Sequence, residues 1–391
     1  MLRTNLTVNK TYFENLDGLR FFCFLSVFFF HSFHTDLPEI KASPAFNFIK
    51  HDLFGNGFLG VNFFFVLSGF LITYLLVKEK KSKGNINIIH FWIRRILRIW
   101  PLYFACVFYG FVIFPFTKTL AGGVSTETAN PWYYIAFISN FDYIRKGLPD
   151  ATGLGVLWSV SIEEQFYLAW PLILSLFPVR KFWIPLVIIL AGSLVFRFFN
   201  DVPILHEMHT FSCIGDMALG GLGAFLVLEF PFFKQKLHDL PRWLIIMVYA
   251  MFLLVFFFRD EFMLGSFFAR VFERIFISSL MLFIILEQCY AENSFFKMGN
   301  FKFVSWLGLI TYGLYCIHFI VISASNAIIG KLGFNTKVWE VVYLETIVSL
   351  LITIAVSLLS YRFFEKPFLL LKERFSFGPR PILTQQKVDV G

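Results

Sequence analysis

The sequence has 391 residues, of which 57% are hydrophobic, 20% are aromatic and only 15% are charged. Soluble domains are about half apolar and about a quarter charged, so this composition excludes an ordinary soluble fold. The formal net charge is +8, but the aromatic residues sit in long apolar runs that belong in lipid rather than on a nucleic-acid surface. We therefore expect an all-α integral membrane protein whose main partner is the lipid bilayer, with no nucleic acid bound.

Ten apolar runs of about the length of a membrane helix follow one another along the chain. They cover residues 17–34, 57–77, 100–117, 156–177, 183–199, 211–229, 243–258, 267–289, 304–329 and 339–363. An eleventh run, residues 132–141, is too short to cross a bilayer unaided and is predicted to be re-entrant or interfacial. Most Lys and Arg residues then fall on the side of both termini, which predicts cytoplasmic termini. We expect about ten transmembrane helices plus this one short segment.

The composition of the end of the chain predicts where the membrane domain stops. Residues 368–391 follow the last apolar run and are basic, so we predict a short cytoplasmic tail there. The membrane domain would then be residues 1–367, with no appended soluble domain.

The five cysteines show no CxxC spacing, and the two histidines of HEMH (206–209) lie in a short loop without a third ligand. No metal site is therefore expected.

Arg20 and His31 are ionisable side chains within the first apolar run, where such groups cost at least a few kcal/mol and are functional candidates. Eleven residues of helix make about three full turns, so both side chains share one face with a rise of roughly 16 Å between them. They could therefore line one path through the bundle. The alternative is an arginine that reaches the membrane surface and a histidine that bonds to a neighbouring carbonyl.

Three arginines, Arg94, Arg95 and Arg98, group within the segment HFWIRRILRIWPLYF, residues 90–104. Spacings of three and four residues place them on one face of an amphipathic helix with apolar residues opposite. Guanidinium groups at a membrane interface suit phosphates. We predict that these arginines bind either anionic lipid headgroups or the phosphates of a cofactor.

Two adjacent carboxylates, Glu163 and Glu164, open an otherwise apolar helix in the segment LWSVSIEEQFYLAWP. Glu163 shares a stripe with three aromatic residues, whereas Glu164 points about 100° away and could reach another helix. Glu163 lies at a predicted depth comparable with that of His31, and a carboxylate that touches an imidazole forms a general base. The alternative is a structural salt bridge of the carboxylate with Arg197 or Arg270.

Further polar and aromatic side chains in the same apolar segments are candidates for lining a substrate pocket. They are Ser68, Trp158, Ser161, Tyr167, Tyr312 and His318. Ser68 precedes Gly69 in the middle of a run, where small residues usually allow close helix packing rather than chemistry. His318 is the rival of His31 as the catalytic base.

The motifs occur in one order: LDGLR followed, after ten intervening residues, by a histidine, then FFxLSGFL, RRxxRIxPxY, WSxSxEExFY, TYxxYxxH and a terminal ExP. In this order, over Leu16 to Pro367, the chain resembles the membrane-bound acyltransferase family 3. The resemblance implies a ten-helix enzyme of the bacterial inner membrane. Such an enzyme transfers an acetyl or other short acyl group from acyl-CoA to a hydroxyl of a surface carbohydrate, such as lipopolysaccharide, peptidoglycan or exopolysaccharide.

The resemblance also assigns roles to individual residues. Catalysis falls to His31 and Glu163. Binding of the donor, acetyl-CoA or another acyl-CoA, falls to Arg20, Arg94, Arg95 and Arg98. We expect His31 to remove the proton of the acceptor hydroxyl as it attacks the thioester, with Glu163 orienting the imidazole. An acyl-histidine intermediate is the other route.

Two other functions stay open at this point. Buried Arg, His and Glu side chains along one path also describe a proton-coupled transporter or a flippase of a lipid-linked glycan or small molecule. The same enzyme acting on an acceptor at the cytoplasmic face is the third possibility. Acyl transfer by the purified protein without a gradient distinguishes the enzyme from the transporter.

Overall fold

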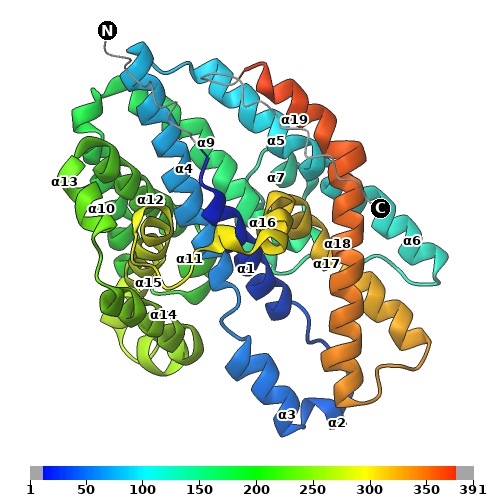
Figure 1. The fold of residues 1–391 in the computed structure, drawn as a ribbon. Helices are drawn as coiled ribbons and strands as arrows, with labels where there is room; N and C mark the ends of the chain where they lie inside the picture. Colours follow the sequence, from blue (N-terminus) through cyan, green and yellow to red (C-terminus); the bar gives the residue numbers. More distant parts are fainter. Residues whose placement is uncertain (1–11, 376–391) are drawn as a thin grey trace, which may run out of the picture.

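A computed structural model describes residues 12–375, and every regular element within that range is a helix (Figure 1). The predicted all-α class is therefore confirmed for the described residues. In Figure 1 the helices form one bundle, in which α1 lies near the middle and α19 lies beside α5 on one flank.

The ten predicted apolar runs are all helical. The principal helices are α1 (Glu14–Phe30), α4 (Leu59–Lys83), α5 (Ile88–Phe108), α9 (Leu157–Leu176), α10 (Trp183–Phe199), α12 (Thr210–Glu229), α14 (Arg242–Met263), α15 (Phe267–Tyr290), α17 (Thr311–Lys331) and α18 (Thr346–Leu359).

Seven helical stretches within residues 12–375 are long and apolar enough to span a bilayer. They are Leu59–Lys83, Ile88–Leu120, Val179–Phe199, Thr210–Glu229, Arg242–Met263, Thr311–Lys331 and Glu340–Glu373. The predicted count of about ten spans is not confirmed. The helices outside the seven are α1, which has only 17 residues, and α9 and α15, which carry charged side chains in their interiors.

Short elements connect the principal helices. They are α2 (Pro38–Lys41), α3 (Pro44–Asn47), η1 (Phe48–Leu53), η2 (Tyr109–Ile113), α6 (Phe114–Leu120), α7 (Pro131–Ile135), α8 (Ser139–Lys146), η3 (Thr152–Val156), η4 (Val179–Lys181), α11 (Pro203–Met208), α13 (Pro231–His238), η5 (Met298–Asn300), α16 (Lys302–Leu309), η6 (Glu340–Glu345), η7 (Ser360–Glu365) and α19 (Lys366–Glu373). The short run at residues 132–141 falls on α7 and α8, of five and eight residues, and neither is long enough to cross a bilayer.

Glycines let the helices around the site approach one another closely. A Cβ at Gly69 of α4 would collide with the backbone carbonyl of Met217 of α12, and one at Gly220 would collide with that of Val66. A Cβ at Gly308 of α16 would likewise collide with the carbonyl of Asp17 on α1. The predicted packing role of the small residues beside Ser68 therefore holds at Gly69, because only glycine leaves room for direct backbone contact between the two helices.

The chain continues as a helix beyond the predicted end of the membrane domain. Residues 368–373 were expected to begin the basic tail, but they belong to α19, which follows η7 without a break and packs against α5. Phe368 and the three leucines after it supply the apolar face of this helix, which a charge count does not take into account. Residues 376–391 of the predicted tail lie outside the described residues.

Candidate active site

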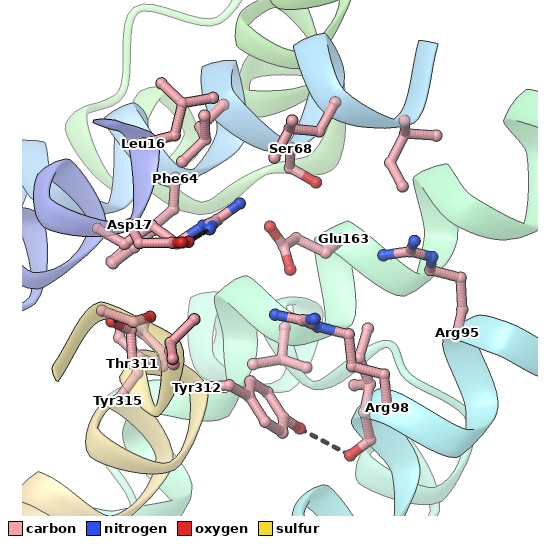
Figure 2. Close-up of a pocket in the computed structure, with 18 of the residues that line it drawn as sticks. Leu16, Asp17, Phe64, Ser68, Arg95, Arg98, Glu163, Thr311, Tyr312 and Tyr315 are labelled. Carbon is pink, nitrogen blue, oxygen red and sulfur yellow. Dashed lines mark hydrogen bonds and ion pairs between the residues drawn. The ribbon is translucent and has the colours of Figure 1, made fainter. Parts of the chain in front are cut away.

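A cavity of about 510 Å³ lies between α1, α4, α5, α9, α17 and α19. Apolar and aromatic side chains make up most of its lining. The ionisable Asp, Glu, Arg and Lys side chains that also line it are Asp17, Arg20, Arg95, Arg98, Glu163, Glu365, Lys372 and Glu373. Figure 2 shows Glu163, Arg95 and Arg98 projecting into this space. Because ionisable groups at membrane depth are rare and usually functional, we take this cavity as the candidate active site.

Helix α5 divides the predicted arginine trio. Arg95 and Arg98 line the cavity. Arg94 does not: its guanidinium lies 3.6 Å from the Glu79 carboxylate and donates a hydrogen bond of 2.7 Å to the backbone carbonyl of Phe375. The three side chains were expected to act together. Arg94 instead turns toward α4 and the end of α19, because it pairs there with the buried carboxylate of Glu79.

Arg20 lines the cavity from α1 and forms an ion pair with Asp17, one turn earlier on the same helix. Asp17 also accepts a hydrogen bond from Tyr12 and is almost fully buried. The charge of Arg20 is thus largely balanced by its own helix. Arg20 therefore differs from Arg95 and Arg98, for which no carboxylate partner within ion-pair distance is found among residues 12–375.

Glu163 and Tyr167 reach the cavity from α9, as their shared stripe predicted. The hydroxyl of Tyr167 is hydrogen-bonded to that of Ser68 on α4, and the guanidinium of Arg95 lies 5.7 Å from the centre of the Tyr167 ring. Glu163 interacts with both hydroxyls and with the charge of Arg95. The carboxylate therefore belongs to the group of side chains that faces the arginine end of the cavity.

Glu164 points away from the cavity, as its position on the helix predicted. Its Oε2 accepts a hydrogen bond of 2.8 Å from the indole of Trp100 on α5. The proposed structural partners of these carboxylates are occupied elsewhere: Arg197 donates to backbone carbonyls such as that of Val271, at 3.0 Å, and Arg270 pairs with Asp201. The salt-bridge alternative for Glu163 is therefore not realised in the described part of the chain.

His31 lies at the C-terminal end of α1 and meets His318 of α17. Its Nδ1 is 3.2 Å from Nε2 of His318, and its ring stacks on Phe319 with 4.6 Å between the ring centres. His318 is fully buried, and its Nδ1 lies 2.6 Å from the backbone carbonyl of Tyr315. The two rival candidates for the base are thus direct neighbours.

The hydrogen bonds of this pair define the tautomers of two neutral rings. A carbonyl oxygen only accepts, so Nδ1 of His318 carries the hydrogen and its Nε2 is the acceptor. Nδ1 of His31 must then donate to that Nε2. Nε2 of His31 keeps its lone pair and is the atom that can remove a proton.

Glu163 does not contact His31 in the described residues. The partner of His31 is His318, and His31 is not part of the cavity lining. Tyr315 lines the cavity next to His318, with 5.7 Å between the ring centres, and its hydroxyl lies 2.6 Å from that of Ser159 and 3.2 Å from the carbonyl of Val156. Equal depth on two helices was therefore insufficient, because the imidazole of His31 meets His318 of α17 and not Glu163 of α9.

The other predicted pocket residues divide into two groups. Ser68, Tyr167 and Tyr312 line the cavity, and the hydroxyl of Tyr312 donates to the carbonyl of Ile99 at 2.7 Å (Figure 2). Ser161 and Trp158 do not line it. Ser161 is buried against Ser139 and Tyr103, at 2.7 and 3.4 Å, and the ring of Trp158 packs against that of Phe65.

Several residues of the cavity were missed by the sequence analysis. They are Asp17, Ser159, Tyr315, Glu365, Lys372 and Glu373. Asp17 stands three residues before Arg20 on one helix, and this spacing alone predicts an ion pair. Lys372 was missed because it fell in the segment that was assigned to the tail. Within residues 12–375 no group of three or more His, Cys, Asp or Glu side chains is arranged to hold a metal ion.

The fold and the cavity define an integral membrane protein with a polar, arginine-lined site inside a helical bundle. Residues 13–362 match the family model described as an acyltransferase domain, and the chain belongs to this family. The match confirms the family that the ordered motifs predicted, and with it the class of enzyme. No solved structure matches the chain.

The chain is similar to proteins of Bacillus subtilis and Staphylococcus aureus. The chain is 28% identical to "Putative peptidoglycan O-acetyltransferase YrhL" of Bacillus subtilis (strain 168), over 92% of this chain and 55% of the relative. It is 27% identical to O-acetyltransferase OatA of Staphylococcus aureus (strain NCTC 8325 / PS 47), over 91% of this chain and 57% of the relative. The chain therefore spans little more than half the length of these relatives.

Proposed function

We propose that this protein is an O-acyltransferase that moves an acetyl or other short acyl group from acyl-CoA to a hydroxyl of a cell-envelope carbohydrate. The name of the Bacillus relative makes peptidoglycan the first acceptor to test. We place the protein in the bacterial cytoplasmic membrane with both termini in the cytoplasm, because that orientation puts most Lys and Arg residues inside. The observation that supports the proposal is a cavity with two arginines at one end that have no carboxylate partner among residues 12–375, and a pair of histidines, His31 and His318, beside the other end.

The arginine end of the cavity suits the phosphates of the donor. Arg95 and Arg98 project into the cavity without carboxylate partners among the described residues, so both guanidiniums can form charge-assisted hydrogen bonds with phosphate oxygens. The pantetheine arm would extend past Arg20 and Glu163 toward Tyr315. This direction brings the thioester to the turn of α17 that also carries His318.

His31 is the proposed base. Its Nε2 takes the proton of the acceptor hydroxyl while that oxygen attacks the thioester carbonyl carbon. The resulting tetrahedral intermediate expels the CoA thiolate as the carbon–sulfur bond breaks, and the proton passes from His31 to the thiolate. The products are an O-acyl sugar and free CoA. His318 holds the imidazole of His31 in the required tautomer, the role that the sequence analysis gave to Glu163.

Glu163 keeps a place in the mechanism at the cavity wall. It faces Arg95 and the hydroxyls of Tyr167 and Ser68, so it orients the groups that surround the donor. Tyr315 lines the cavity and His31 does not, so we propose that the side chain of Tyr315 moves away from Ser159 during transfer. The reaction therefore includes a rearrangement at Tyr315 before the acyl group and the base meet.

The test uses the full chain purified in lipid nanodiscs, with acetyl-CoA and a soluble peptidoglycan fragment. We expect release of free CoA and an added acetyl mass on the fragment, both lost in His31→Ala although that variant inserts normally. No gradient is present, so a transporter or flippase would leave acetyl-CoA unchanged. Release of CoA at the wild-type rate by His31→Ala would remove His31 as the base. Surface glycans of matched strains with and without the gene then identify the natural acceptor by mass spectrometry.

A further inference from the structure

Three cationic side chains meet at the end of the cavity that lies between α5 and α19. Arg95 and Arg98 come from α5, and Lys372 comes from the last turns of α19. Lys372 is close enough to both arginines to feel their charges, and Arg95 and Arg98 in turn repel each other. None of the three has a hydrogen bond or an ion pair with another residue in the range 12–375.

The side chain of Arg95 shows most clearly that a partner is missing. Its guanidinium lies between two aromatic rings, 5.6 Å from the centre of Phe91 and 5.7 Å from that of Tyr167. The rings hold the guanidinium plane but leave its N–H edges free. Nε of Arg95 is buried without any hydrogen-bond partner among the described residues. A buried, unsatisfied donor beside two more cations indicates a binding site for an anion.

Arg94 explains how α19 is held at this place. It donates to the carbonyl of Phe375, two residues beyond the end of α19, and pairs with Glu79 on α4. The ring of His90 adds an edge contact with Phe375, at 5.5 Å between centres. Arg94 therefore fastens the end of α19 to α5 and brings Lys372 over the cavity, instead of binding the anion itself.

The carboxylates nearby do not neutralise the three cations. Glu365 and Glu373 line the same cavity, but neither lies within ion-pair distance of Arg95, Arg98 or Lys372 in the described part of the chain. Glu365 accepts a hydrogen bond of 2.9 Å from Ser360 instead. Like charges held together in a partly dry site repel one another strongly, so a bound anion with more than one charge would stabilise this arrangement.

We propose that Lys372 completes a phosphate-binding site with Arg95 and Arg98, and that this site holds the phosphate groups of the donor nucleotide. The inference rests on the proposed function for the identity of the donor. Two guanidiniums and one ammonium match a phosphate ester in charge and in donor geometry. A phospholipid headgroup has the same phosphate chemistry, and the experiment below separates the two sources.

The experiment measures binding of CoA, without turnover, to the full chain in phosphatidylcholine nanodiscs by isothermal titration calorimetry. Lys372→Gln is compared with Lys366→Gln, which removes the same charge from an exposed position on the same helix outside the cavity. We expect Lys372→Gln to raise the Kd for CoA about tenfold or more, because a charge-assisted hydrogen bond to phosphate is lost. Lys366→Gln should change the Kd less than about twofold, and Lys372→Arg should restore most of the affinity.

Three results would overturn the proposal. Equal affinity of Lys372→Gln and the wild type for CoA would remove Lys372 from the donor site while leaving the proposed function intact. No CoA binding by the wild type would instead contradict the donor, and with it the proposed function. Binding of phosphatidylglycerol that is weakened by Lys372→Gln, with unchanged CoA binding, would assign the site to a lipid headgroup.

Discussion

Nδ1 of His31 lies 3.2 Å from Nε2 of His318, although the two residues are 287 positions apart in the chain. The carbonyl of Tyr315 fixes the hydrogen on the far nitrogen of His318, so a neutral pair leaves Nε2 of His31 as the free acceptor. A base whose tautomer is set by a neighbour follows the same logic as a catalytic triad, with an imidazole in place of the carboxylate.

This arrangement predicts different effects for two substitutions of His318. His318→Gln keeps an acceptor for the Nδ1 hydrogen of His31, whereas His318→Leu has none. We expect the leucine variant to lose about tenfold to hundredfold in kcat for acyl transfer with little change in KM for acetyl-CoA, and the glutamine variant to recover most of the loss. Steady-state kinetics in nanodiscs measure both parameters.

The control for that comparison is His51→Gln, an exposed histidine on η1 that should have near wild-type kinetics. Equal loss in the glutamine and leucine variants would contradict a role in setting the tautomer. It would show that the site needs an imidazole at position 318 for another reason.

Glu163 and Glu164 form a natural matched pair, since they are adjacent and only Glu163 faces the cavity. Glu163→Gln should lower kcat/KM about tenfold or more, because the charge facing Arg95 is lost. Glu164→Gln should stay within about threefold, since its hydrogen bond to Trp100 lies outside the cavity and an amide oxygen can still accept it. The assay is acetyl transfer to a peptidoglycan fragment. A larger loss in Glu164→Gln would show that the wrong carboxylate has been placed in the site.

Because Arg95 lines the cavity and Arg94 does not, we predict that substituting Arg95 weakens donor binding, whereas substituting Arg94 lowers stability. Arg95→Gln should raise KM for acetyl-CoA about tenfold with little effect on thermal unfolding, because its guanidinium makes no hydrogen bond or ion pair with another residue in the described structure. Arg94→Gln should lower the unfolding temperature by a few degrees, since it loses its contacts with Glu79 and Phe375. Donor titrations and thermal unfolding in the same nanodiscs separate the effects, and identical profiles for the two variants would contradict the division.

The close contact of α4 with α12 predicts a strong effect of one added methyl group. Gly220→Ala places a Cβ against the carbonyl of Val66, so the helices must separate, and we expect about 1–3 kcal/mol of destabilisation. Gly192→Ala on α10 is the control, because no atom lies near its added Cβ. The control should be neutral or slightly stabilising, since alanine is the better helix former. Chemical or thermal unfolding in detergent tests both, and equal stability of the two variants would show that the helices can part at no cost.

The sequence alone determined the parts of this protein that depend on one helix at a time. Apolar runs located the helices, because lipid excludes unpaired backbone groups wherever they occur. Helical spacing correctly predicted that Glu163 and Glu164 point in different directions and that Glu163 shares a face with Tyr167. The repeat of 3.6 residues per turn fixes these directions within a single helix. The ordered motifs predicted the family, which the domain match confirmed.

Only the tertiary structure decided which of these faces meet. Spacing could not show that His31 pairs with His318 instead of Glu163, that Arg94 turns to Glu79, or that Lys372 joins Arg95 and Arg98. Each of these contacts depends on how helices rotate and approach one another. Those choices follow from packing across the bundle, for example where Gly220 lets two backbones touch, and no pattern within a single helix records them.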